Sequence, residues 1–148
     1  MSNIRITKQF SFETGHALYG YDGKCKNIHG HSYHLYVTVI GCPIVDEKNP
    51  KNGMVMDFGE ISRIVKEEIV NDLDHCVVLN KSMPQKDFLE VEELYDRLFL
   101  APYQPTCENM VIDFKDRLIP RMPMGVKLHS IRLFETAKSY AEWFAEDN

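Results

Sequence analysis

The chain has 148 residues, of which 44% are apolar and 26% charged, and its 17 basic and 22 acidic residues give a formal net charge of −5. This length suits a single domain, 1–148, with a core of its own, and the weakly acidic balance argues against a nucleic-acid-binding protein. No apolar run approaches the roughly 20 residues of a membrane helix, and the N-terminal residues lack an apolar signal core, so we expect a cytoplasmic protein without a membrane partner.

Residues 4–12 alternate between apolar and polar side chains, which is the pattern of a half-buried strand. The apolar side chains, among them Phe10 and Phe12, all share one parity. The same parity continues to His16. We therefore expect His16 to project from the core side just past the strand, unless Gly15 introduces a bulge.

A second strand is predicted over residues 32–41, and the parity of its apolar residues extends back through His31 and His29. Two strands joined by one loop most simply pair antiparallel. Such pairing would bring His16 next to the two histidines at one end of the sheet. His34 lies on the opposite parity, so we exclude it from this group and predict a surface position.

Two helices follow. The first is predicted over residues 58–71, where Asp57 stands before an apolar stripe of helical spacing. The second begins at Pro105-Thr106, with Thr106 as its N-cap, and ends at Pro120. Between them, the segment 81–104 is acidic and irregular, and only a short helix is expected there.

Two strands, Val126–Glu135 and Tyr140–Ala145, complete the predicted elements. The resulting order is strand-strand-helix-helix-strand-strand. We predict an α+β fold in which a four-stranded antiparallel sheet carries both helices on one face. The other face would then be exposed to water or covered by another subunit.

The chemistry of the chain centres on His29-Gly30-His31, because two histidines separated by one residue share a face of an extended backbone. With His16 they would supply three imidazoles, which leave an open fourth position on a tetrahedral zinc ion, as in catalytic sites. Cys25 would be a thiol near the metal and free to act as a base. The alternatives are histidines without a metal, an inert loop thiol, and another divalent ion that imidazole also suits.

Five short motifs follow one another along the chain. They are Phe12-Glu-Thr-Gly-His16, Cys25-x-x-x-His29-Gly-His31, Leu73-Asp74-His75 with Leu79-Asn80, Pro105-Thr106-x-Glu108-Asn109, and Glu135-Thr136. In this order they resemble the 6-pyruvoyl-tetrahydropterin synthase and 6-carboxy-tetrahydropterin synthase family, and the resemblance covers nearly the whole chain. Any one motif alone would be weak, since His-Gly-His also occurs by chance.

The resemblance implies a tunnelling-type fold and a homo-oligomer, a trimer or a hexamer, with active sites between subunits. The segment 81–104 looks longer than in short bacterial members and is interpreted as a family-variable insertion. By the same resemblance, Asp74 and His75 form a proton relay that can act on the Cys25 of a neighbouring subunit. The implied site residues are His16, His29 and His31 as Zn²⁺ ligands, Cys25, Asp74 and His75 as catalytic residues, and Glu135, Glu108 and Thr106 as substrate-binding residues.

Family substrates are 7,8-dihydroneopterin triphosphate and its relatives. We expect a zinc-dependent 6-carboxy-5,6,7,8-tetrahydropterin synthase of queuosine-type biosynthesis, which releases acetaldehyde and triphosphate. The alternative is a 6-pyruvoyl-tetrahydropterin synthase, which eliminates triphosphate and retains all carbons. Two other hypotheses are ring hydrolysis of a purine nucleotide, as in GTP cyclohydrolases, and a non-catalytic pterin- or nucleotide-binding module whose structural metal includes Cys25 as a ligand.

Some of these residues also have ordinary structural interpretations. Asp74 and His75 could simply end a helix, where a histidine interacts favourably with the dipole. Glu108 could serve only the first turn of its helix, and Glu135 could be a charge at the end of a strand. The cysteines show no short-spaced pair, so we expect reduced thiols and assign structural roles to Cys42, Cys76 and Cys107.

Overall fold

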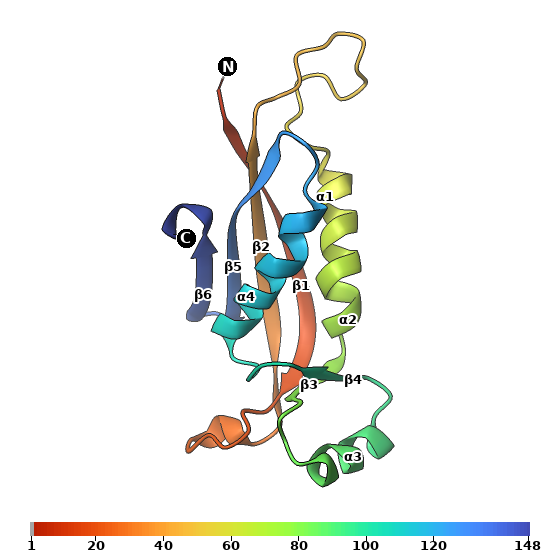
Figure 1. Cartoon of the computed structure of the whole chain (residues 1–148), viewed down its shortest axis with the longest axis vertical. Helices are drawn as coiled ribbons and strands as arrows, with labels where there is room; N and C mark the ends of the chain where they lie inside the picture. Colours follow the sequence, from red (N-terminus) through yellow and green to blue (C-terminus); the bar gives the residue numbers. More distant parts are fainter. Residues whose placement is uncertain (1) are drawn as a thin grey trace.

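Residues 2–148, the part of the chain that the computed structural model describes, form one six-stranded mixed sheet with two long helices packed on one of its faces (Figure 1). The strand order across the sheet is β4-β3-β1-β2-β5-β6. The strands are β1 (Ile4–His16), β2 (His29–Gly41), β3 (Cys76–Asn80), β4 (Leu98–Ala101), β5 (Val126–Thr136) and β6 (Ser139–Phe144).

The predicted four-stranded antiparallel sheet is wrong, because β3 and β4 extend the sheet beyond β1. β3 pairs parallel with β1, and β4 pairs parallel with β3. Both strands are short, and β3 consists of a continuous apolar run without the alternation that marks a half-buried strand. The predicted order strand-strand-helix-helix-strand-strand therefore lacks β3 and β4. β4 lies inside the segment 81–104, together with the short helix expected there, α3 (Gln85–Leu94).

β1 and β2 form a long antiparallel hairpin in which every residue from Ile4 to His16 has a partner between Gly41 and His29. The pairing contains no bulge at Gly15, so the alternation of buried and exposed side chains runs through to His16. His34 is exposed, as predicted. The hairpin thus carries a continuous core face and brings the predicted histidines to one end.

The helix predicted over residues 58–71 is confirmed, with a π-helical segment near its end. It comprises α1 (Phe58–Val65), η2 (Lys66–Val70, π-helical) and α2 (Asn71–Leu73). Asp57 caps it by accepting the Gly59 N–H at 2.6 Å. None of the helices formed by residues 2–148 has the length and apolar character that crossing a membrane requires.

The second predicted helix is also confirmed, as α4 (Cys107–Leu118), with Thr106 accepting the Asn109 N–H at 3.2 Å. Its apolar face meets the hairpin in the core, where the rings of Phe12 and Phe114 lie 6.2 Å apart and edge to face. Three short 3₁₀ helices complete the elements: η1 (Lys24–Lys26), η3 (Ile119–Arg121) and η4 (Ala145–Asp147).

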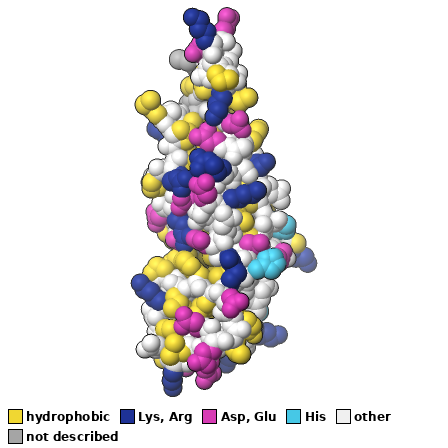
Figure 2. All heavy atoms as spheres, turned by 90° about the vertical axis from the view of Figure 1, so that its right-hand side faces the viewer, with side chains coloured by type: hydrophobic (Ala, Val, Ile, Leu, Met, Phe, Trp, Pro, Cys, Tyr) yellow, Lys and Arg dark blue, Asp and Glu magenta, His cyan; other side chains and the backbone are white. Residues whose placement is uncertain are grey.

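Charges of both signs cover the face formed by the long helices. Figure 2 shows this side of the molecule, with Lys and Arg side chains beside Asp and Glu side chains. Glu67 pairs with Arg63 at 3.0 Å and with Arg121 at 2.8 Å, and Arg117 pairs with Asp113 at 2.7 Å. The first and third of these pairs each lie within one helix, and the Glu67–Arg121 pair joins the helix over residues 58–73 to η3, which follows α4.

Candidate metal centre and active site

Three histidines converge where β1 ends and β2 begins. His16 pairs directly with His29 across the hairpin, and His31 follows two residues later on the same face. Each of the three residues offers a ring nitrogen, and these nitrogens lie within 4.8 Å of one another. The predicted convergence is confirmed, and the cluster is able to hold a metal ion.

Two backbone carbonyls fix the tautomers of this cluster. His16 Nδ1 lies 2.7 Å from the carbonyl oxygen of Pro105, and His29 Nδ1 lies 2.7 Å from that of Asn27. A carbonyl only accepts, so each Nδ1 must carry the proton and each Nε2 must present a lone pair. Histidines that ligate metals are held in this way.

The donor set fits a tetrahedral cation. The Nε2 atoms of His16 and His29 lie 3.1 Å apart, and with both Nδ1 atoms protonated no proton is left to form a hydrogen bond between them. Two nitrogens bound at about 2.0–2.1 Å to one tetrahedral ion would lie roughly 3.3 Å apart. A shared cation is therefore the arrangement that satisfies both lone pairs.

Burial favours the neutral form of two of these imidazoles, those of His16 and His31. The pKa of His16 is lowered chiefly because the side chain is buried, with only 2% exposed. The pKa of His31 is lowered for the same first reason, which outweighs the nearby carboxylate of Glu135. Neutral imidazole is the metal-binding form, so the site is prepared for a cation near neutral pH.

Glu135 lies at the edge of the histidine cluster. Its Oε1 atom is 3.6 Å from His16 Nε2 and 3.7 Å from His31 Nε2. The buried hydroxyl of Tyr33 donates a long hydrogen bond of 3.4 Å to the same oxygen. Burial, followed by the Glu135 charge, raises the pKa of Tyr33, so the phenol stays protonated and remains a donor.

Cys25 lies in η1, on the loop between β1 and β2, and its thiol is exposed. The Leu18 N–H donates to the Cys25 carbonyl at 2.9 Å, which closes this loop on itself. Cys76 and Cys107 are buried, as predicted, and burial raises the pKa of both thiols.

Asp74 and His75 form an ion-pair contact of 3.1 Å between Oδ2 and Nδ1, just after α2. His75 has the left-handed backbone angle φ 56°, which is uncommon outside glycine and tends to persist where function requires it. Asp74 accepts the backbone N–H of Glu13 at 2.9 Å, and this hydrogen bond is the main reason why its pKa is lowered. The carboxylate is therefore ionised and oriented toward the imidazole.

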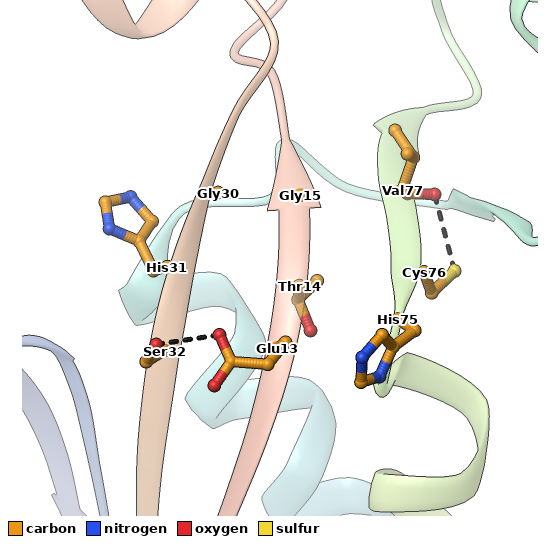
Figure 3. Close-up of a pocket in the computed structure, with 9 residues that line it drawn as sticks. All are labelled: Glu13, Thr14, Gly15, Gly30, His31, Ser32, His75, Cys76 and Val77. Atoms are coloured by element: carbon orange, nitrogen blue, oxygen red, sulfur yellow. Dashed lines mark hydrogen bonds between the residues drawn. The ribbon is translucent and has the colours of Figure 1, made fainter.

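His75 of the relay pair lies on the side of the hairpin opposite His16 and His29, while His31 of the cluster lines the same pocket as His75. His75 lines a pocket together with Glu13 and Ser32, which occupy the exposed parity of β1 and β2 (Figure 3). His16 and His29 belong to the other parity, which faces the helices. The two predicted groups are thus brought to the same end of the sheet, but not onto one face of it.

Two further predicted residues lie at the start of α4. Thr106 is the N-cap, and Glu108 is an exposed residue of the first turn. These positions agree with the capping interpretation and leave a role in substrate binding as a prediction. Sequence analysis missed Tyr33, although it shares the parity of the histidines, and it missed the backbone carbonyls of Asn27 and Pro105.

Comparison with known proteins places these features in a family. A family model described as 6-pyruvoyl tetrahydropterin synthase matches residues 5–146. The chain is 33% identical over 142 residues to the 6-carboxy-5,6,7,8-tetrahydropterin synthase of Haemophilus influenzae, covering 95% of this chain and 98% of the relative. It is 30% identical over 144 residues to the human 6-pyruvoyl tetrahydrobiopterin synthase, covering 89% of this chain and 85% of the relative.

Solved structures share the fold. An uncharacterised protein from Wolinella succinogenes matches with a TM-score of 0.76 at 22% identity, covering 98% of this chain and 99% of that chain. The Caenorhabditis elegans 6-pyruvoyl tetrahydropterin synthase matches with a TM-score of 0.68 at 23% identity, covering 98% and 97%. Both matches extend over nearly the whole chain.

Proposed function

The chain belongs to the 6-pyruvoyl tetrahydropterin synthase family, and we propose that it is a zinc-dependent 6-carboxy-5,6,7,8-tetrahydropterin synthase. It would convert 7,8-dihydroneopterin triphosphate and water into 6-carboxy-tetrahydropterin, acetaldehyde and triphosphate. The observation that carries this proposal is the cluster of three imidazoles with two fixed tautomers. The name of the Haemophilus influenzae relative, which is similar over nearly the full length of both chains, favours the carboxy product over the pyruvoyl product.

The metal would be held by His16, His29 and His31, with the fourth position open to substrate. Zn²⁺ bound there would supply Lewis-acid stabilisation of negative charge on the side-chain oxygens of the substrate. The Pro105 and Asn27 carbonyls keep two of the imidazoles in the tautomer that this requires.

Cys25 would act as the base that removes a proton from the carbon side chain of the substrate. Lys24 and Lys26 flank it in the sequence. The exposed position on the loop between β1 and β2 leaves the sulfur accessible to a ligand. A proton taken from carbon then has to be returned elsewhere, which requires a second group.

Asp74 and His75 would provide this second group. The carboxylate at 3.1 Å fixes the tautomer of the imidazole, so that the other ring nitrogen can exchange a proton with the substrate. Because His75 lies on the side of the hairpin opposite His16 and His29, the relay would serve the metal site of a neighbouring subunit in a homo-oligomer, a trimer or a hexamer. Glu135 would anchor the pterin ring by accepting two N–H groups, with Glu108 and Thr106 at the mouth of the site.

The deciding experiment compares Cys25→Ala with the wild-type protein. Zinc content per chain and turnover of 7,8-dihydroneopterin triphosphate are measured, with products resolved by mass. We expect zinc to remain near its wild-type level while turnover falls by roughly 10²–10⁴-fold, the usual contribution of a general base. Cys42→Ala, which changes another exposed cysteine, is the matched control and should alter neither quantity.

Other outcomes point to other functions. Release of a product that retains all carbons, without acetaldehyde, would identify a 6-pyruvoyl-tetrahydropterin synthase. Loss of zinc with the Cys25 thiol would make the cysteine a ligand and would favour a cyclohydrolase-like enzyme or a structural metal site.

A further inference from the structure

Glu13 holds the relay pair in place through its backbone. Its N–H donates to Asp74 Oδ1 at 2.9 Å, and its carbonyl oxygen accepts the N–H of His75 at 2.6 Å. The two bonds fix the turn in which His75 takes its left-handed backbone angle. The backbone of Glu13 therefore positions His75. The Glu13 side chain lies on the same face of the sheet as the His75 imidazole.

The Glu13 side chain has no part in these two bonds and is free for another role. Its carboxylate accepts a hydrogen bond of 2.7 Å from the Ser32 hydroxyl across the hairpin. Figure 3 shows the carboxylate on the open face of the sheet, between Ser32 on one side and His75 on the other. One partner for two carboxylate oxygens leaves acceptor capacity for a ligand.

A pocket of about 400 Å³ opens in front of these groups. Two glycines, Gly15 and Gly30, are paired opposite each other in it, and their missing side chains leave the backbone uncovered. A pocket of this size suits a small organic group. The lining residues are Glu13, Thr14, Gly15, Gly30, His31, Ser32, His75, Cys76 and Val77.

The chemistry of the lining selects the group that enters. The carboxylate of Glu13, with that of Asp74 beside it, repels phosphate and accepts hydrogen bonds from hydroxyl groups. The imidazole of His75 can exchange a proton with a hydroxyl held there. The pocket thus suits the neutral, hydroxylated part of a substrate and not its anionic end.

We propose that Glu13 is a substrate-binding residue whose carboxylate accepts a hydrogen bond from a side-chain hydroxyl of the pterin substrate and presents that hydroxyl to His75. This inference rests on the proposed function, because it needs a substrate with hydroxyls next to the reacting carbon. Ser32 orients the carboxylate from the neighbouring strand.

The test compares two ligands that differ only in the side chain. Binding of 7,8-dihydroneopterin, which carries three hydroxyls, and of 7,8-dihydropterin, which has no side chain, is measured by calorimetry on wild type and on Glu13→Gln. Glutamine keeps the size of the side chain, an acceptor for Ser32 and the backbone contacts. We expect Glu13→Gln to bind 7,8-dihydroneopterin about tenfold or more weakly, as for loss of a hydrogen bond to a charged acceptor, and to bind 7,8-dihydropterin as the wild type does.

Glu47→Gln is the matched control, since Glu47 is exposed in the loop after β2, at the other end of the hairpin. It should bind both ligands like the wild type. Equal weakening of both ligands in Glu13→Gln, or no weakening of either, would overturn the inference alone. A wild-type protein that binds neither pterin would overturn the proposed function, and the inference with it.

Discussion

The histidine cluster depends on two backbone carbonyls as much as on three side chains. The carbonyls of Pro105 and Asn27 set the tautomers of His16 and His29, and burial keeps the imidazole of His16 neutral. The convergence of the side chains follows from alternation and from pairing within one hairpin, and both can be read from sequence. The carbonyls could not be predicted, because a backbone acceptor leaves no residue-type signal and Pro105 is 89 residues from its partner.

Removing one imidazole tests the metal centre. Loss of a group that only orients a metal ligand lowers metal affinity by roughly 10–100-fold. We expect His31→Ala to lower zinc affinity by more than this, because the variant loses a ligand itself and water does not replace the third nitrogen. Metal content after dialysis against a chelator of known affinity measures this.

The control for this prediction lies on the same strand. His34→Ala removes an exposed imidazole on the opposite parity of β2 and should leave the metal content unchanged. Equal losses in both variants would mean that the strand, and not the ligand set, had been disturbed.

The strands and helices differ in how far their sequence predicts them. β1, β2 and both long helices follow from local periodicity, because each buries one face and exposes the other. β3 and β4 were not predicted, because a short apolar run does not show whether it forms a strand or part of a buried helix. They join the sheet only through parallel pairing with strands distant in sequence, which is a tertiary effect.

The π-helical segment explains the spacing of the first long helix. Four of its five buried residues recur every fourth position, at Ile61, Val65, Ile69 and Leu73, and the fifth is Ile64. In an ideal α-helix this spacing drifts by about 40° per step, because 3.6 residues make one turn. The wider turn of the π segment at η2 reduces the drift and keeps Leu73 on the core face, directly before Asp74.

Substitutions of Thr106 distinguish a role in capping α4 from a role in binding substrate. We expect Thr106→Ala to lower the free energy of unfolding by about 1 kcal/mol, since the Asn109 N–H at the start of α4 loses its acceptor. Thr106→Ser keeps the hydroxyl and should retain most of that stability. Urea unfolding at one fixed protein concentration measures both variants, because assembly also contributes to stability.

A second cap serves as the reference for this prediction. Asp57→Ala removes the cap of α1, far from the site, and should cost a similar free energy without changing pterin binding. If Thr106→Ala is as stable as wild type but binds pterin more weakly, the hydroxyl serves the substrate and not the helix.

In the whole molecule, the sheet divides the proposed catalytic groups between its two faces. His16 and His29 face the helices, His75 faces the opposite side, and His31 lines the same pocket as His75. A complete site would then combine groups of two subunits. The histidine cluster follows from strand alternation and the relay pair from the resemblance, but the face on which His75 lies depends on β3, which was not predicted.

Mixing two inactive variants tests this division. Cys25→Ala and His75→Asn should each be nearly inactive alone, and asparagine tolerates the left-handed backbone angle that residue 75 adopts. Random co-assembly in equal amounts should restore activity at about one site in four, where an intact cysteine meets an intact histidine across an interface. Turnover is measured after joint refolding.

The control replaces His75→Asn with the double variant Cys25→Ala/His75→Asn. Mixed with Cys25→Ala, it supplies no intact cysteine and should restore nothing. Mixed oligomers of the two single variants that stay as inactive as their parents would show that each subunit works alone.

The distance along the chain between His16 and Pro105 also bears on folding. A contact spanning 89 residues has a high loop-closure cost and forms only after the intervening elements have docked. The lone pair of His16 is therefore directed into the cluster only when the connection leading to α4 has taken its place. The nascent chain consequently carries all three imidazoles long before the cluster has its native geometry, so loading of the proposed metal is expected at the end of folding, in molecules that have reached the native state.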